Sequence, residues 1–446
     1  MDIQLDNLIA AYPATSTPKF QQIYGEKKEF AELSSDINEK LPPGRGHLYK
    51  HQKLTQRTLR AYNKIMTIAE TGTGKSCQSL SFLEYSRKEI EKYRESNGLS
   101  GDPRVQLYRK IVIIVKGKTQ KAEIRQQLAC RCSDGRYETE HINSAKDNKA
   151  QRAALTARIK GEGYEITTNG SFANSINKLH EDAWKIVSSR YPLEAVEGET
   201  KSQREAREIQ RINTIKEETT EALKVILANR YSDTIIWIDE AHNIIPDDAK
   251  IQTEEDFLED YYATLLKGKT TPLDNSNKYW RIWQVLHHSN RGKHIISTAT
   301  PMIDSYEEII PIINLLLPLN NEIPADMNLE TITDNDLRVL FPKAPKDIDR
   351  TRDALTPYFK GQMDKHDIST LNIDNLEPFF RGKISYIRSG DDGVVVKQMG
   401  KPLCEYIGST YQSMVYASVM SDKQRTAYEK ASSSNNFYMS SRHASN

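Results

Sequence analysis

Five short runs of apolar, mostly β-branched residues are the feature that most restricts how this chain can fold. Most of them are apolar at every position rather than at alternate positions, which is typical of strands covered on both faces, as in a parallel sheet. Long charged stretches of helical character separate them. The alternation predicts an α/β lobe with a doubly wound parallel sheet and helices on both faces. The runs cover residues 65–69, 111–115, 164–168, 234–238 and 294–298.

Length and charge narrow the classes of protein further. The chain has 446 residues, and a single core seldom grows beyond about 250–300 residues, so we expect more than one structural unit. The formal net charge is only +1, although 28% of the residues are charged. Nucleic acid would therefore have to bind at a local patch or groove rather than in an overall basic field.

The sequence carries no sign of a membrane or secretory protein. Its start lacks the pattern of a signal peptide, and the longest apolar stretch, residues 309–319, is too short for a bilayer and contains two prolines. The cysteines show no zinc-binding spacing, so we interpret them as reduced thiols in a protein that is not secreted. These cysteines are Cys77, Cys130, Cys132 and Cys404.

The stretch AETGTGKS joins the first run to a helical segment. Its glycines let backbone N–H groups approach a phosphate at the start of a helix, where the helix dipole favours negative charge. Lys75 is placed to reach the β- and γ-phosphates, and the Ser76 hydroxyl to bind Mg²⁺. A plain glycine turn at a strand–helix junction is the alternative, because Ala69 stands where the strict pattern has glycine. The predicted nucleotide-binding residues of this loop are Gly72, Thr73, Gly74, Lys75, Ser76 and Cys77.

Acidic and hydroxyl side chains follow two later runs. The fourth run ends in Asp239 and Glu240, and an acid at the carboxyl end of a strand beside a phosphate loop is well placed to bind Mg²⁺. We expect Asp239 to hold the metal and Glu240 to orient and deprotonate the attacking water. The fifth run leads into Thr298 and Thr300. These hydroxyls can bond to the acidic motif and shift when the γ-phosphate leaves; taken alone, they suit a simple strand exit equally well.

The order and spacing of these three motifs resemble those of superfamily 2 helicase-type ATPases. AETGTGKS is similar to motif I, DEAH at 239–242 to motif II, and TAT at 298–300 to motif III. The resemblance implies a RecA-like lobe that binds ATP and Mg²⁺, tolerates Ala69, and uses His242 with the two threonines to couple the nucleotide site to nucleic acid. The segment LYKHQKLTQRTLRAY resembles the adenine-reading segment of the family, with Gln52 as its candidate, although a surface glutamine on a helix is an alternative.

A narrower resemblance covers most of residues 45–446. Segments such as TGTGKSC, IVIIVKG and STATPMIDSYEEIIPIINLLLP are similar to ATPases of large cytoplasmic DNA viruses. Two branches fit, the small subunit of the poxvirus-type early transcription factor and nucleoside triphosphatase I. FFRGKISYIRS also resembles the Swi/Snf-like link between two motor lobes. The resemblance implies location in the virion and host cytoplasm, with DNA and either viral RNA polymerase or a second transcription-factor subunit as partners.

Three functions stay open at this point. The first is a DNA-dependent ATPase that hydrolyses ATP with Mg²⁺ to move on DNA during viral early transcription. The second is a transcription termination or release ATPase of the same family. The third is a scaffold subunit whose ATPase site is idle, for which the long charged helical stretches would serve as a binding surface.

The resemblance also implies an arrangement of domains. We expect an N-terminal extension at 1–44, the RecA-like lobe at 45–305 with a helical insertion at about 181–228, and a mainly helical linking region at 306–446. The later motifs, which carry arginines from a second RecA-like lobe, are not found in this sequence, so we expect that lobe to be missing or truncated. Because such an arginine is worth about 10³–10⁵ in turnover, the chain alone should bind Mg-ATP but hydrolyse it slowly.

The loops after the second and third runs are similar to the family's track for the nucleic-acid backbone. Lysines there could contact phosphates, and hydroxyl and amide groups could add hydrogen bonds that fix position without reading sequence. A solvated loop is an equally good interpretation of the lysines. The candidates for nucleic-acid contact are Lys116, Lys118, Thr168 and Asn169, with Lys121 and Ser171 beside them.

Overall fold

The computed structural model places the chain in two compact units, Met1–Ser389 and Gly390–Asn446. The described residues of the second unit form one antiparallel pair, β7 (Lys401–Pro402) with β8 (Tyr416–Ala417). The structure describes residues 12–13, 19–33, 47–69, 73–102, 105, 107–130, 132–133, 136–137, 148–192, 196–246, 254–269, 272–301, 311–312, 315–316, 382–387, 401–402 and 416–417.

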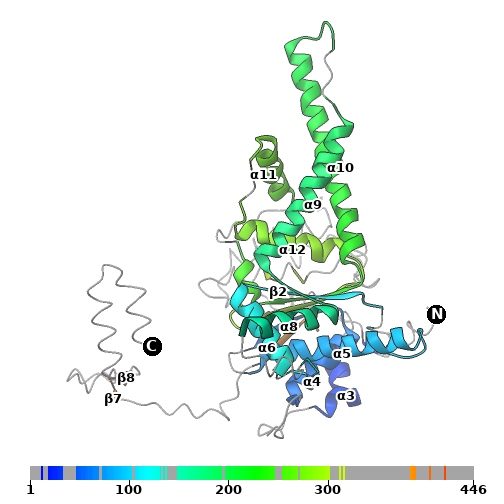
Figure 1. The fold of residues 1–446 in the computed structure, drawn as a ribbon, viewed down its shortest axis with the longest axis vertical. Coiled ribbons are helices and arrows are strands. Elements are labelled where there is room, and N and C mark those ends of the chain that lie inside the picture. The colour runs from blue at the N-terminus through cyan, green and yellow to red at the C-terminus, as the bar shows by residue number, and fades with distance from the viewer. Residues whose placement is uncertain are drawn as a thin grey trace. The chain divides into compact units, whose positions relative to one another are not determined.

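A parallel sheet is the centre of the first unit (Figure 1). Among the described residues it has six strands in the order β3-β2-β4-β5-β1-β6, and every neighbouring pair is parallel. Each of the five apolar runs forms one of these strands, which confirms the predicted α/β class with a RecA-like sheet. The strands are β1 (Lys64–Ala69), β2 (Lys110–Val115), β3 (Tyr164–Thr168), β4 (Thr234–Asp239), β5 (Lys293–Thr298) and β6 (Ile384–Ile387).

Two hydrophobic cores cover the two faces of the sheet. Successive strand residues point to opposite faces, so Ile235 and Trp237 join one core while Ile236 and Ile238 join the other. The first core is closed by α4 (Lys50–Ala61), α5 (Lys75–Glu95), α6 (Lys118–Cys130) and α8 (Asn148–Gly161). The second is closed by α9 (Asn169–Arg190), α10 (Lys201–Tyr231), α11 (Glu254–Leu266) and α12 (Asn275–His288).

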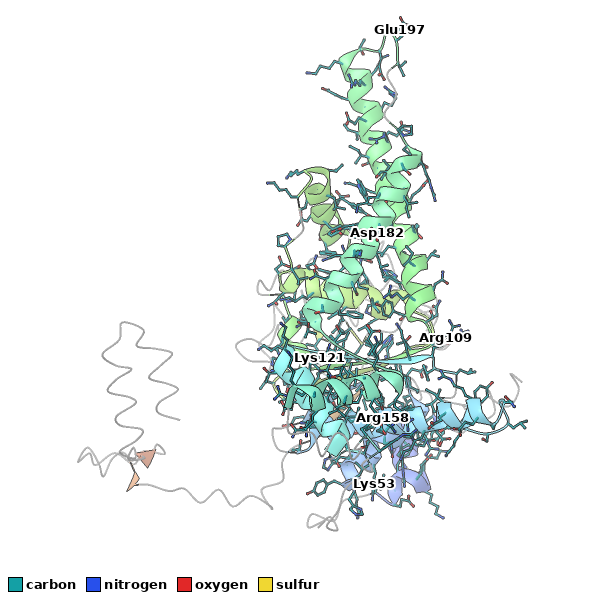
Figure 2. The ribbon with its side chains drawn as sticks, viewed as in Figure 1. Lys53, Arg109, Lys121, Arg158, Asp182 and Glu197 are labelled. Carbon is teal, nitrogen blue, oxygen red and sulfur yellow. A yellow bond between two sulfur atoms is a disulfide. The ribbon has the colours of Figure 1, made fainter. Side chains whose placement is uncertain are left out.

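Helices α9 and α10 form a hairpin that projects away from the sheet (Figure 1). Glu197 lies at its far end (Figure 2). In α10 the buried residues begin at Ile215 and recur every fourth position to Tyr231, so only its C-terminal half packs against the core. Helices α9 and α10 occupy parts of the range 181–228, in which we expected a helical insertion, and both extend beyond that range toward the flanking strands β3 and β4.

Short helices of the N-terminal segment pack on α4 through aromatic rings. They are α2 (Phe20–Glu26) and α3 (Lys28–Ala31). Tyr62 at the end of α4 lies edge-on to Phe20, with 5.6 Å between the ring centroids, and its hydroxyl donates to the Pro13 carbonyl at 2.9 Å. This contact ties the described part of the predicted extension to the lobe. No helix in the described ranges is both long and apolar enough to span a bilayer.

One expectation about the cysteines is wrong. Cys77, in the first turn of α5, forms a disulfide with Cys132, just beyond α6. The two residues are 55 positions apart in the sequence, so their spacing gave no signal. They meet because α5 and α6 lie side by side on the same face of the sheet, where both cysteines border the first core.

The predicted linking region lies largely outside the described residues. Its strand β6 pairs with β1 along Met66 to Ala69, at the edge of the main sheet. The strand formed by the FFRGKISYIRS segment therefore lies beside β1, the strand that leads into the phosphate loop.

Candidate nucleotide-binding site

The three motif-bearing strands lie next to one another. β5 is hydrogen-bonded to β4 on one side and to β1 on the other. Ser297 is the register partner of both Asp239 and Thr67, so the three strands end at the same level. Because the carboxyl ends of parallel strands share one edge of a sheet, the phosphate loop and the acidic and threonine motifs converge there.

The described part of the phosphate loop has the geometry of a helix start. Gly74 is the N-cap of α5 and has φ 80° and ψ 29°, a left-handed conformation that favours glycine. A β-carbon at this position would stand 2.4 Å from Nε2 of Gln52. Lys75, Ser76 and Cys77 form the first turn of α5, which contains no acidic residue. The 21-residue helix thus presents its positive end to this edge. Gly72 lies outside the described residues, whereas Thr73 adjoins Gly74.

Lys75 lies between the two predicted acids. Its ammonium forms an ion pair with Oε1 of Glu240 and lies 3.9 Å from Oδ1 of Asp239. The Lys75 side chain is 12% exposed and that of Asp239 is 9% exposed, so this charge cluster is largely shielded from water. The structure therefore brings together the three residues that sequence reasoning assigned to phosphate, metal and water.

The surroundings of Asp239 disfavour the ionised form of its carboxyl group. Burial raises its pKa from 3.8 to about 6, the Glu240 charge adds to the increase, and Lys75 opposes it. Its Oδ1 is buried and has no hydrogen-bond partner in the described part of the chain. A carboxylate oxygen of this kind is suited to a cation, so the residues present fit Mg²⁺.

A fixed metal cage is not found here. No group of three or more His, Cys, Asp or Glu side chains that could hold a metal ion occurs among the residues the structure describes. Mg²⁺ commonly binds through one or two carboxylates together with substrate phosphates and water. Asp239 and the hydroxyl of Ser76 fit this second arrangement, in which the ion arrives with the nucleotide.

Glu240 has an unusual backbone. Its φ of 54° and ψ of 56° are left-handed, which is uncommon for a residue with a side chain. This turn separates β4 from the short 3₁₀ helix Ala241–Ile244. It directs Oε2 toward the backbone N–H of Ala299, which donates at 3.3 Å, while Oε1 meets Lys75. Residues with strained backbone persist only where the surrounding structure holds them in place, and they are found most often at functional sites.

His242 joins the acidic motif to the threonine motif. Asn243 Nδ2 donates to Glu240 O at 3.0 Å and lies 3.0 Å from His242 Nε2, so Nε2 is the acceptor and Nδ1 carries the proton. Nδ1 then faces Thr298 Oγ1 at 2.9 Å, Glu240 Oε2 at 3.3 Å and Thr300 Oγ1 at 3.4 Å. These contacts connect Glu240, through the His242 ring, to the end of β5.

Gln52 ties α4 to the phosphate loop. Its Oε1 accepts from the Tyr49 N–H at 3.0 Å, and its Nε2 donates to the Gly74 carbonyl at 3.1 Å. His51 adds a second tie, since its Nε2 donates to the Thr73 carbonyl at 3.0 Å. The side-chain amide predicted to read adenine is thus engaged with the loop itself. Sequence reasoning missed the contribution of His51, which no local motif marks.

The candidates for nucleic-acid contact fall into two groups. Lys116 and Lys118 are exposed just beyond β2, at the edge that carries the nucleotide motifs. Thr168 instead caps α9 by accepting from the Ser171 N–H at 3.2 Å. Asn169 is 7% exposed, and its Oδ1 accepts from its neighbour's N–H. The two lysine side chains are thus exposed to solvent, whereas the side chains of Thr168 and Asn169 form hydrogen bonds at the start of α9.

Comparison with known proteins gives one coarse result. No family model matches the chain. The chain is 22% identical over 438 residues to a protein named "Putative helicase 087L" of Invertebrate iridescent virus 3, and the match covers 97% of this chain. It covers 32% of the viral protein, so this chain spans about a third of that protein's length. The chain is thus similar, at low identity, to part of a larger viral protein that is named as a putative helicase.

Proposed function

We propose that this chain is the ATP-binding lobe of a helicase-like, DNA-dependent ATPase that acts in the early transcription of a large DNA virus. The observation that carries the proposal is the contact of Lys75 with Asp239 and Glu240 at the ends of adjacent parallel strands. The hydrogen bond from His242 to Thr298 supports a link from this cluster to a mechanical output. The similarity to a viral helicase-named protein agrees with this class.

The proposed chemistry starts with an exchange of partners at Lys75. Backbone N–H groups at the start of α5 bind the β- and γ-phosphates, and Lys75 leaves Glu240 to contact them. Mg²⁺, held by Ser76 and Asp239, would neutralise charge that develops on the phosphate oxygens. Glu240 is then a free carboxylate. Water oxygen attacks the γ-phosphorus, the bond to the β–γ bridging oxygen breaks, and the water proton passes to Glu240.

The same exchange supplies a signal to the rest of the lobe. Glu240 Oε2 also accepts from the Ala299 N–H and faces His242. When the carboxylate turns toward water, both contacts must change, and the Thr298 end of β5 responds. In the proposed motor this response would alter the loops that contact DNA.

Glu240→Gln tests the proposal in the full natural protein that contains this chain. We expect ATP turnover to rise with DNA in the wild type and to fall by roughly 10²–10⁴ in the variant, with ATP still bound. Glu205→Gln on the exposed part of α10 is the matched control and should keep wild-type turnover. Turnover that is indifferent to DNA at low salt, or unaffected by Glu240→Gln, would contradict the proposal.

The same variant separates the other candidate functions. Viral transcription that survives Glu240→Gln, with polymerase or transcription-factor binding intact, would indicate a scaffold with an idle site. The projecting α9–α10 hairpin, whose exposed side chains include Ile186 and Ile209, is the observation that keeps this candidate open. Release of transcripts from stalled polymerase, rather than start of transcription, would indicate the termination role.

A further inference from the structure

A fully buried hydroxyl lies behind the candidate site. Ser297 Oγ accepts from the indole N–H of Trp237 at 2.9 Å. It also bonds to Thr67 Oγ1 at 2.9 Å and to Ser79 Oγ at 3.2 Å. All four side chains belong to residues with 0% exposure. We name this group of four residues the Ser297 cluster.

The cluster joins four different elements. Ser297 is on β5, Trp237 on β4, Thr67 on β1 and Ser79 on α5. Each member also stands one to three residues from a residue of the candidate site or its loop. These neighbours are Thr298 for Ser297, Asp239 for Trp237, Ala69 for Thr67 and Ser76 for Ser79.

The hydrogen-bonding capacity of Ser297 is completely used. A serine hydroxyl has one proton and two lone pairs, and an indole N–H can only donate. Ser297 must therefore accept from Trp237, which leaves one proton and one lone pair for Thr67 and Ser79. The three strands are also joined by backbone bonds, but α5 has no place in that ladder. The bond to Ser79 is consequently a direct polar tie between the sheet and the helix that begins at the phosphate loop.

We infer that Ser297 is a positioning residue for ATP hydrolysis, which holds the phosphate-loop helix in register with the strands that carry Asp239 and Thr298. This inference rests on the proposed ATPase function. Nucleotide binding relies on groups within the loop, whereas hydrolysis relies on the distance from that loop to Glu240. Loss of the tie should therefore lower kcat and leave the KM for ATP nearly unchanged.

Two serines on α5 provide a matched test. Ser79 and Ser86 are both 0% exposed, but the Ser86 hydroxyl donates within its own helix, to the Phe82 carbonyl at 2.9 Å. Ser79→Ala cuts the tie while Ser297 keeps Trp237 and Thr67. In the full natural protein with DNA, we expect Ser79→Ala and Ser297→Ala to lower kcat about 10- to 100-fold, with KM within about threefold of wild type. Ser86→Ala should keep the wild-type kcat.

The outcomes separate this inference from the proposed function. A wild-type protein that hydrolyses no ATP overturns the proposed function itself. An active wild type with equal kcat in Ser79→Ala and Ser86→Ala overturns only the positioning role. A parallel loss of ATP affinity and thermal stability in Ser79→Ala also overturns it, because that pattern describes a general packing defect. Should Ser297→Ala fail to fold, Ser79→Ala alone decides, since it leaves the indole N–H with its acceptor.

Discussion

Replacing Asp239 by asparagine should stabilise the metal-free protein while abolishing the proposed ATPase activity. Burial raises the pKa of this carboxyl from 3.8 to about 6. At 1.36 kcal/mol per pH unit, this difference means that the ionised carboxylate destabilises the fold by about 3 kcal/mol. Asparagine has nearly the same shape without the charge, so the substitution should recover at most this amount.

The sign of the pH dependence follows from proton binding. The folded carboxyl holds its proton up to about pH 6, whereas the unfolded one releases it near pH 3.8. Between these values the folded state binds more protons, so stability falls as pH rises through this window and the full cost is present above it. The gain from Asp239→Asn should therefore be largest at pH 8 and much smaller near pH 4.

Thermal unfolding followed by circular dichroism in EDTA measures this gain. At about 2–4 °C per kcal/mol for a domain of this order of size, Tm should rise by up to roughly 6–12 °C at pH 8. Asp182→Asn, an exposed acid on α9, is the control and should change Tm little (Figure 2). A variant no more stable than wild type at pH 8 in EDTA would refute the reasoning that this carboxylate is destabilised by burial.

Three further predictions follow from the same region. Reduction of the Cys77–Cys132 disulfide, whose cysteines are 55 positions apart, should lower the free energy of unfolding by up to about 4 kcal/mol. Urea unfolding with and without a dithiol measures this loss, and an unchanged urea midpoint would contradict the prediction. Gly74→Ala should reduce ATP affinity at least tenfold in a titration with a fluorescent ATP analogue, because a residue with a β-carbon is strained at a φ of 80° and that carbon would displace the Gln52 amide from the loop. Wild-type affinity would count against the loop geometry. Replacing both Lys116 and Lys118 by alanine should reduce the slope of log K against log salt for duplex DNA by about two, while a slope equal to that of wild type would remove these lysines from the DNA track.

The parts of the fold that could be predicted from the sequence are those determined by residues close together along the chain. The run from Ile235 to Ile238 is apolar at every position, and β4 is buried there on both faces. Strand β6 gave no comparable signal, because Ile384 and Tyr386 are exposed at the sheet edge and the run is only four residues long. Its place depends on β1, more than 300 positions earlier in the sequence.

The same limit applies to the candidate site. Lys75 and Asp239 stand in local motifs whose chemistry can be read directly, so their proximity could be predicted. The role of Ser297 could not, because its three partners come from separate elements and no spacing in the sequence relates them. Gln52 was singled out for adenine, but its contact with Gly74 depends on how α4 packs on α5.

The sheet order has a consequence for how the protein is made. Strand β1 leaves the ribosome long before its neighbour β6, which includes residues up to Ile387. At a synthesis rate of about 5–20 residues per second, β1 waits roughly 15–65 s for that partner. During this interval the nascent chain carries an unpaired strand edge, which is a template for pairing with other chains. Chains stalled on the ribosome before β6 has left the exit tunnel should therefore display an aggregation-prone species, which disappears once β6 has emerged.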